Sequence, residues 1–176
     1  MFQGGTQGFY DHMVFLVGNV KTEARRLKYT YRRLTGLDLP EMNALLKVFG
    51  EAFKEPATYQ GNAPSEAYLK NLLDKTEFIV LVAFIGEEVI GGLAAYVLEK
   101  FEQERKEIYI YDLAVAERHR RRGVAKSLIT KLKSIGRATG AYIIFVQADK
   151  MDTAAIRLYE SLGEGEEVLN FDIPMT

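Results

Sequence analysis

The chain has 176 residues and a formal net charge of −1, and it contains two histidines and no cysteine. Its length suits one domain with a sizeable core, and its near-neutral charge argues against a general nucleic-acid binder. The absence of cysteine excludes disulfides, thiolate metal sites and a thiolate nucleophile, and two histidines are too few for a histidine-based metal centre. No apolar run approaches the roughly 20 residues that span a bilayer, so we expect a cytoplasmic protein without a membrane partner.

Residues 1–28 are predicted to be an N-terminal extension of the domain. A short apolar run, Met13–Val17, follows several glycines, and the first lysine is Lys21, which does not suit a signal peptide. We therefore assign residues 29–176 to a single domain.

The first half of this domain has the pattern of a strand followed by two helices. Tyr29–Leu34 has the composition of a strand. Asp38 suits the N-cap of a helix, with Pro40 in its first turn. A loop at Pro56–Pro64 then leads to a second helix, which Ser65 can cap.

The second half has the pattern of a hairpin followed by strand–helix units. Glu77–Ile85 and Glu88–Leu98 suit paired strands, and Ala141–Gln147 is continuously apolar, as in strands buried on both faces. The other predicted elements are a strand at Glu107–Val115, a helix from Val124 to the glycines Gly136 and Gly140, a helix at Thr153–Leu162 capped by Asp152, and a last strand at Glu167–Ile173. This order predicts an α/β domain with a mixed sheet and helices on both faces.

A basic turn joins the middle strand to the helix that follows it. Gly123 has no Cβ, which lets the backbone approach a ligand closely. The first turn of a helix has N–H groups without partners and carries partial positive charge. Three arginines beside such a helix end suit a di- or triphosphate, although they also suit a solvated basic loop. The residues that would line this anion site are Arg120, Arg121, Arg122, Gly123, Val124, Ala125 and Lys126.

Asp112 lies in the middle of a predicted strand, between Tyr111 and Leu113. A carboxylate is uncommon there and is costly to bury without a partner. Asp112 therefore suits either a buried ion pair or a functional role. In the functional role it would be a general base, or the anchor for an ammonium group that must lose a proton.

Several of these segments resemble a known family. The spacing Arg120-x-x-Gly123-x-Ala125, after a strand and at the start of a helix, resembles the acyl-CoA pyrophosphate signature of the GCN5-related N-acetyltransferases. The segments EIYIYDLAV, HRRRGVA, GAYIIFVQAD and EEVLNFDI, with FKEPATYQ earlier, are similar to aminoglycoside 3-N-acetyltransferases of the gentamicin/fortimicin type. The resemblance implies a mostly antiparallel sheet whose central strands splay apart.

The resemblance also implies a reaction, the transfer of acetyl from acetyl-CoA to a primary amine without a metal. Backbone groups of Leu113, Ala114 and Val115 would hold the pantetheine arm as if it were an added strand, although these residues also suit an ordinary buried strand. Tyr159 would donate a proton to the departing thiolate, or it packs its ring on the sheet. Direct attack by the amine in a ternary complex is favoured over an acyl-enzyme.

Aminoglycosides are polycations, so their pocket should carry carboxylates. Each acidic candidate also suits a solvated surface charge, and Asp152 suits a helix cap. His119 could act as a base, but its place beside the arginines favours support of the anion site. The residues that we expect to contact the substrate are Tyr111, Asp149, Glu167 and Asp172.

The leading hypothesis is an acetyl-CoA-dependent aminoglycoside 3-N-acetyltransferase that confers antibiotic resistance. One alternative is an acetyltransferase of polyamines or other small amines, and another is a non-catalytic acyl-CoA-binding module. The predicted partner is a small polycationic molecule rather than nucleic acid or membrane, and a homodimer is left open.

Overall fold

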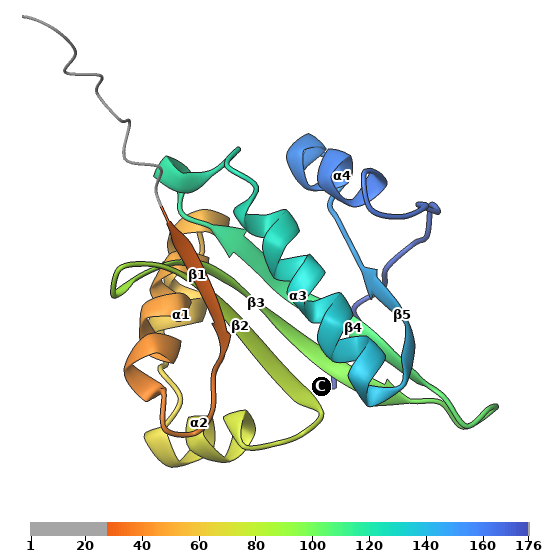
Figure 1. Ribbon diagram of the computed structural model, residues 1–176, viewed down its shortest axis with the longest axis horizontal. Coiled ribbons are helices and arrows are strands. Elements are labelled where there is room, and N and C mark those ends of the chain that lie inside the picture. The colour runs from red at the N-terminus through yellow and green to blue at the C-terminus, as the bar shows by residue number, and fades with distance from the viewer. Residues whose placement is uncertain (1–27, 176) are drawn as a thin grey trace, which may run out of the picture.

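The computed structural model describes residues 28–175, so the predicted N-terminal extension lies almost entirely outside the described residues. A single sheet forms the centre of the molecule, in the spatial order β1-β2-β3-β4-β5 (Figure 1). The first three pairs of strands are antiparallel, and β4 and β5 are parallel. The strands are β1 (Tyr29–Arg33), β2 (Phe78–Ile85), β3 (Glu88–Glu99), β4 (Lys106–Val115) and β5 (Ala141–Val146).

The helices cover both faces of this sheet, which confirms the predicted α/β fold (Figure 1). One face packs against α1 (Leu39–Phe53) and α2 (Glu66–Leu73). The other face packs against α3 (Val124–Thr139), and side chains in and just after α4 (Thr153–Glu160) border the same core. A short π-helical turn, η1 (Ala57–Gly61), lies between α1 and α2.

Each face of the sheet has its own apolar core. Ile108 and Ile110 of β4 pack with Leu128 and Leu132 of α3, and all four side chains are almost completely buried. On the opposite face the core joins α1 and α2 to β2. Because helices cover both faces of the sheet, the side chains on both sides of β2 are buried, which explains its continuously apolar sequence.

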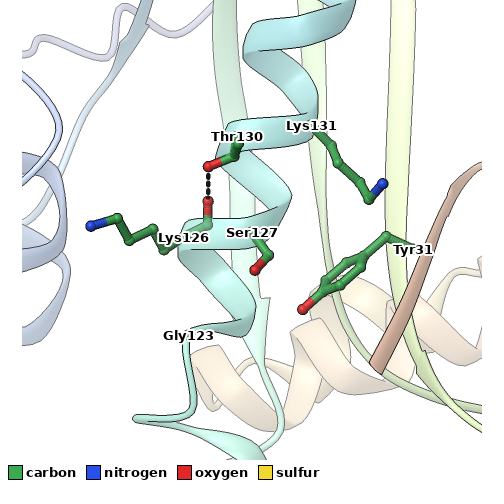
Figure 2. Close-up of a pocket in the computed structure, with 6 residues that line it drawn as sticks. All are labelled: Tyr31, Gly123, Lys126, Ser127, Thr130 and Lys131. Carbon is green, nitrogen blue, oxygen red and sulfur yellow. Dashed lines mark hydrogen bonds between the residues drawn. The ribbon is translucent and has the colours of Figure 1, made fainter. Parts of the chain in front are cut away.

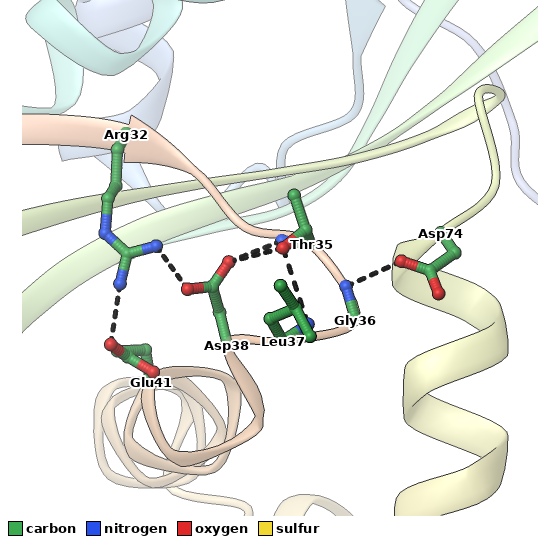
Figure 3. Close-up of polar contacts among 7 residues, drawn as sticks. All are labelled: Arg32, Thr35, Gly36, Leu37, Asp38, Glu41 and Asp74. Carbon is green, nitrogen blue, oxygen red and sulfur yellow. Dashed lines mark hydrogen bonds and ion pairs between the residues drawn. The ribbon is translucent and has the colours of Figure 1, made fainter.

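The start of α1 differs from the prediction (Figure 3). Asp38 occupies the N-cap position, but its carboxylate makes no capping hydrogen bond to the helix. It accepts hydrogen bonds from the backbone N–H and the hydroxyl of Thr35, at 2.7 and 2.8 Å, and pairs with Arg32 at 2.6 Å. The guanidinium of Arg32 also pairs with Glu41 in the first helical turn, so β1 and α1 are joined through this arginine. Ser65 and Asp152, in contrast, cap α2 and α4 as predicted.

The predicted last strand, Glu167–Ile173, is wrong, because these residues have no regular secondary structure. A strand needs a hydrogen-bonded neighbour, and none of the strand pairs in residues 28–175 includes this segment. The expected two-sided burial of β5 is wrong for a related reason. The strand lies at the edge of the sheet, and Ile143 and Phe145 are partly exposed.

None of the helices in the described part of the chain is long and apolar enough to cross a membrane.

Candidate active site

A β-bulge in β4 brings the polar residues of this strand to one face of the sheet. Asp112 lies opposite Ala94 of β3, and Ile110 lies opposite Ala95, so Tyr111 has no partner in the register. An extra residue of this kind reverses the alternation of side chains along the strand. Tyr111 and Asp112 therefore face the side of the sheet that α1 and α2 cover, while Ile110 stays in the core under α3.

The pairing of β4 with β5 ends at the same point. The last paired residues are Ile110 and Val146, whereas the pairing of β4 with β3 continues to Val115. Beyond this point the two strands separate, and the chain after β5 leads away to α4 (Figure 1). The segment Leu113–Val115 therefore has a strand on only one side, where an extended ligand could add its own hydrogen bonds.

The turn between β4 and α3 contains two residues with left-handed backbone conformations. Arg121 and Gly123 both adopt left-handed conformations, with φ of 61° and 79°, immediately before α3 begins at Val124. A Cβ at Gly123 would meet no atom within 4 Å, so the glycine is required by its backbone angle and not by crowding. Arg121 and Arg122 are exposed, while Nε of Arg120 donates to the carbonyl of Val115 at 3.0 Å.

A groove of about 580 Å³ lies beside the first turns of α3, between this helix and β1 (Figure 2). Ser127 and Lys131 point toward Tyr31 across the groove, and the Lys131 ammonium lies 5.7 Å from the centre of the Tyr31 ring. Lys126 points the other way, so its charge lies on the side of α3 away from Tyr31.

His119 connects the basic turn to β1, and its side chain is buried, with only 6% exposed. Its Nδ1 lies 3.2 Å from the Tyr29 hydroxyl, and its Nε2 accepts a hydrogen bond from Arg118 at 3.2 Å. Burial, with the charges of Arg118 and Arg122, lowers the pKa of His119, so the imidazole is neutral. Both ring nitrogens thus have a neighbour within the protein, which argues against His119 as a catalytic base, and its support of an anion site stays a prediction.

Asp112 is half-buried, and its Oδ1 accepts a hydrogen bond from the Tyr59 hydroxyl at 3.1 Å. No ion pair among residues 28–175 includes Asp112, which removes the alternative of a buried ion pair within them. Burial raises the pKa of Asp112, the hydrogen bond from Tyr59 lowers it, and the nearby charge of Glu55 raises it again, with a net increase. A carboxylate with a raised pKa is a stronger proton acceptor.

Tyr159 lies on α4, and its half-buried ring borders the core under α3. Burial first, and then the charge of Asp152, raises the pKa of Tyr159 to about 12. The hydroxyl is therefore protonated at neutral pH and can donate a proton. Asp112 contacts Tyr59 on the face that α1 covers, whereas Tyr159 borders the core on the α3 face, so the two groups lie on opposite faces of the sheet.

The acidic residues predicted to contact the substrate have local partners or are free in solvent. Oδ1 of Asp149 accepts from the backbone N–H of Met151 at 2.7 Å, and Glu167 pairs with Lys150 at 3.3 Å on the surface. Asp172 is exposed in the segment without regular structure. Their role toward a substrate remains a prediction.

The sequence analysis named Tyr111 as a substrate contact, which stays a prediction, but it missed the other rings of an aromatic surface next to Asp112. Tyr109 stacks on Phe145 of β5 at 4.9 Å, and Tyr111 meets both Tyr109 and Tyr96 edge to face, at 5.9 and 6.0 Å. Tyr111 remains 63% exposed. The period of two between Tyr109 and Tyr111 was the available signal. Tyr96 and Phe145 lie on other strands, so their place in this surface could be predicted only with the register of the sheet.

Comparison with known proteins identifies the family of this fold and site. Residues 42–163 match the model of the Acetyltransferase (GNAT) family. The chain belongs to this family. Its members use acetyl-CoA, and the splayed strands and the turn before α3 fit such a cosubstrate.

Two solved structures of aminoglycoside acetyltransferases are similar to this chain in sequence and in fold. An aminoglycoside acetyltransferase from an uncultured soil metagenomic sample is 54% identical, with a TM-score of 0.83, covering 85% of this chain and 99% of the other. A second soil metagenomic aminoglycoside acetyltransferase, solved in complex with sisomicin, is 33% identical, with a TM-score of 0.78, covering 84% and 97%.

Curated proteins match over shorter stretches. N-acetyltransferase 8B of Rattus norvegicus is 30% identical over 82 residues, which are 47% of this chain and 37% of that protein. The chain therefore spans little more than a third of the length of this relative.

Proposed function

We propose that this protein transfers the acetyl group of acetyl-CoA to an amino group of an aminoglycoside. The observation that carries the proposal is the end of the β4–β5 pairing at Ile110, which leaves Leu113–Val115 open on one side, between Asp112 and the basic turn. The similarity to two aminoglycoside acetyltransferase structures supports the class of substrate.

In this proposal the turn before α3 binds the diphosphate of the cosubstrate. The N–H groups of Val124, Ala125 and Lys126 belong to the first turn of α3, where the helix dipole favours an anion. Arg121 and Arg122 are exposed on the same turn and add positive charge. The free side of Leu113–Val115 then holds the extended pantetheine arm as an added strand, as the family resemblance implies.

Acetyl-CoA supplies the activated acyl group, and residues of this chain move the protons. Asp112 accepts a proton from the substrate ammonium, so that the free amine can form a bond to the acyl carbon while the carbon–sulfur bond breaks. Tyr159 donates its proton to the departing sulfur, and the second proton lost by the acylated nitrogen returns through water to the Tyr159 phenolate, which leaves a neutral amide and the CoA thiol. Holding both substrates together in a ternary complex can lower the barrier by roughly 7–11 kcal/mol.

The surface around Asp112 suits a cationic amino sugar. Exposed aromatic rings bind the apolar faces of sugars and attract ammonium groups through their π faces. Tyr109, Tyr111 and Phe145 form such a surface, and the carboxylates of Glu55 and Asp112 lie near each other beside it. The proposed position of acetylation, the 3-amino group, rests on the resemblance to the gentamicin/fortimicin-type enzymes.

The test is release of CoA from acetyl-CoA in the presence of gentamicin, sisomicin and linear polyamines, with the modified nitrogen located by NMR of the product. We expect a kcat/KM for at least one aminoglycoside well above that for polyamines, and acetylation at the 3-amino group. Faster turnover of polyamines would contradict the aminoglycoside assignment. CoA binding without turnover of any amine would identify a non-catalytic module.

A further inference from the structure

The segment Phe53–Gln60 is similar to the gentamicin/fortimicin-type enzymes, but the proposed chemistry gives it no role. In the structure α1 ends at Phe53, Lys54 adopts a left-handed conformation with φ of 61°, and the chain turns back into η1. The carbonyl of Glu55 accepts hydrogen bonds from the N–H groups of Thr58 and Tyr59, at 3.1 and 3.3 Å. This tight turn directs Tyr59 over the face of β4 that carries Asp112.

The ring of Tyr59 is held on two sides by aromatic neighbours in α1. Its centre lies 5.8 Å from that of Phe49 and 5.7 Å from that of Phe53. Phe49 itself is only 1% exposed, so the ring of Tyr59 is attached to a rigid part of the core. A phenol fixed in this way presents its hydroxyl with little loss of side-chain freedom.

We infer that Tyr59 is a positioning residue, which holds one carboxylate oxygen of Asp112 so that the other faces the incoming ammonium group. The hydroxyl donates to Oδ1 at 3.1 Å, which leaves Oδ2 for the substrate. The inference rests on the proposed function, because only a proton acceptor at Asp112 needs this orientation. A carboxylate turned by a few tens of degrees would lose its alignment with the amine.

Several ionisable groups around Asp112 act on its pKa together with the hydrogen bond from Tyr59. The ionisable groups that face Asp112 are Glu55 and Tyr59 from the loop, Tyr96 from β3, and Tyr109 and Tyr111 from β4. Of these, only Tyr59 lowers the pKa of Asp112, since burial and Glu55 both raise it. Burial and the charge of Asp112 in turn raise the pKa of Tyr59, so Tyr59 stays protonated and remains a donor.

The test is Tyr59→Phe, which keeps the ring between its aromatic neighbours and removes only the hydroxyl. A hydrogen bond to a charged group lowers the pKa of a carboxyl by about one unit or more, and its loss should raise the pKa of Asp112 by this amount. The acidic limb of the pH profile of kcat/KM should therefore move to higher pH by about one unit. At pH values on the acidic side of this limb, kcat/KM should fall about tenfold, while the KM for acetyl-CoA should stay unchanged. An acidic limb that does not move would overturn the inference.

Tyr142→Phe is the matched control. Tyr142 also donates its hydroxyl to a carboxylate on β4, that of Glu107, but at the opposite end of the strand. The control should leave both the acidic limb and kcat unchanged. A shift of the limb in the control as large as that in Tyr59→Phe would also overturn the inference, because the effect would then not be specific to Asp112.

A second measurement does not need the proposed function. In a protein labelled with ¹³C at aspartate carboxyl groups, the Asp112 resonance, assigned by its loss in Asp112→Asn, should titrate at higher pH in Tyr59→Phe than in the wild type. Glu55→Gln should shift it to lower pH, because it removes a negative neighbour. Unchanged titration in Tyr59→Phe would refute the contact, whereas absent turnover of all amines by the wild type would refute the proposed function, and with it the catalytic purpose of the contact, but not the contact itself.

Discussion

At the scale of single residues, Asp112 has opposite effects on the proposed catalysis and on stability. Its folded pKa is raised, mainly by burial, so the protonated form is favoured in the folded state. Its contribution to stability is therefore greatest at pH values below the pKa of the unfolded chain, and it is lost as pH rises through the folded pKa. At neutral pH the ionised carboxylate of Asp112 is therefore a stronger base than an exposed aspartate, and its burial lowers the stability of the folded protein.

Asp112→Asn should therefore change activity and stability in opposite directions. We expect turnover to fall at least tenfold, or about 1.4 kcal/mol in the barrier, because the amide cannot accept the proton. At pH 7 the Tm should rise slightly, on the order of 2 °C, and this gain should vanish as pH falls toward the usual aspartate pKa of about 3.9. Steady-state kinetics and thermal unfolding at several pH values check both effects. An equally active variant would exclude Asp112 as the base.

Tyr159 gives a second prediction at this scale. Because its pKa is raised to about 12, the phenol is protonated at neutral pH and is available as a proton donor. Tyr159→Phe should lower kcat more than it raises the KM for acetyl-CoA, since the ring still packs in the core beside α3. A variant with unchanged kcat would leave the residue with a packing role alone.

At the scale of elements, apolar periodicity was enough to predict the four α-helices and the five strands of residues 28–175, because those segments bury one or two faces. It missed the π-helical turn Ala57–Gly61, which lies in a predicted loop. It failed at Glu167–Ile173, where strand composition has no neighbouring strand to pair with in the structure. It could not find the bulge at Tyr111, which depends on the register of β3. The contact of Tyr59 with Asp112 joins residues 53 positions apart and needed the fold.

The turn before α3 gives the prediction for an element. Gly123 has φ of 79° and open space around it, so Gly123→Ala should cost about 1–2 kcal/mol in backbone strain and weaken CoA binding only modestly. Gly123→Asp should fold but lose CoA binding, because a carboxylate then stands at the proposed diphosphate site. Calorimetric titration with CoA separates the two variants. Binding by Gly123→Asp at the affinity of the wild type would refute the assignment of the turn.

At the scale of the whole molecule, stability comes from two cores that share one sheet, and the proposed site lies where the sheet opens. Leu132 of α3 and Leu45 of α1 are both fully buried, on opposite faces. The segment Glu167–Ile173 adds little to either core, since Leu169 is 82% exposed. The part of the chain that carries the proposed cosubstrate site is thus anchored by α3, while the last described residues are not anchored in this way.

This contrast can be measured by paired substitutions. Leu132→Ala removes a completely buried side chain and should lower the free energy of unfolding by about 2–5 kcal/mol. Leu169→Ser changes an exposed side chain and should alter it by less than about 0.5 kcal/mol. Urea unfolding of both variants, with the slope compared to that of the wild type, checks the difference. A large loss for Leu169→Ser would mean that Glu167–Ile173 is covered in solution, as a strand would be, because only a buried leucine makes contacts that serine cannot replace.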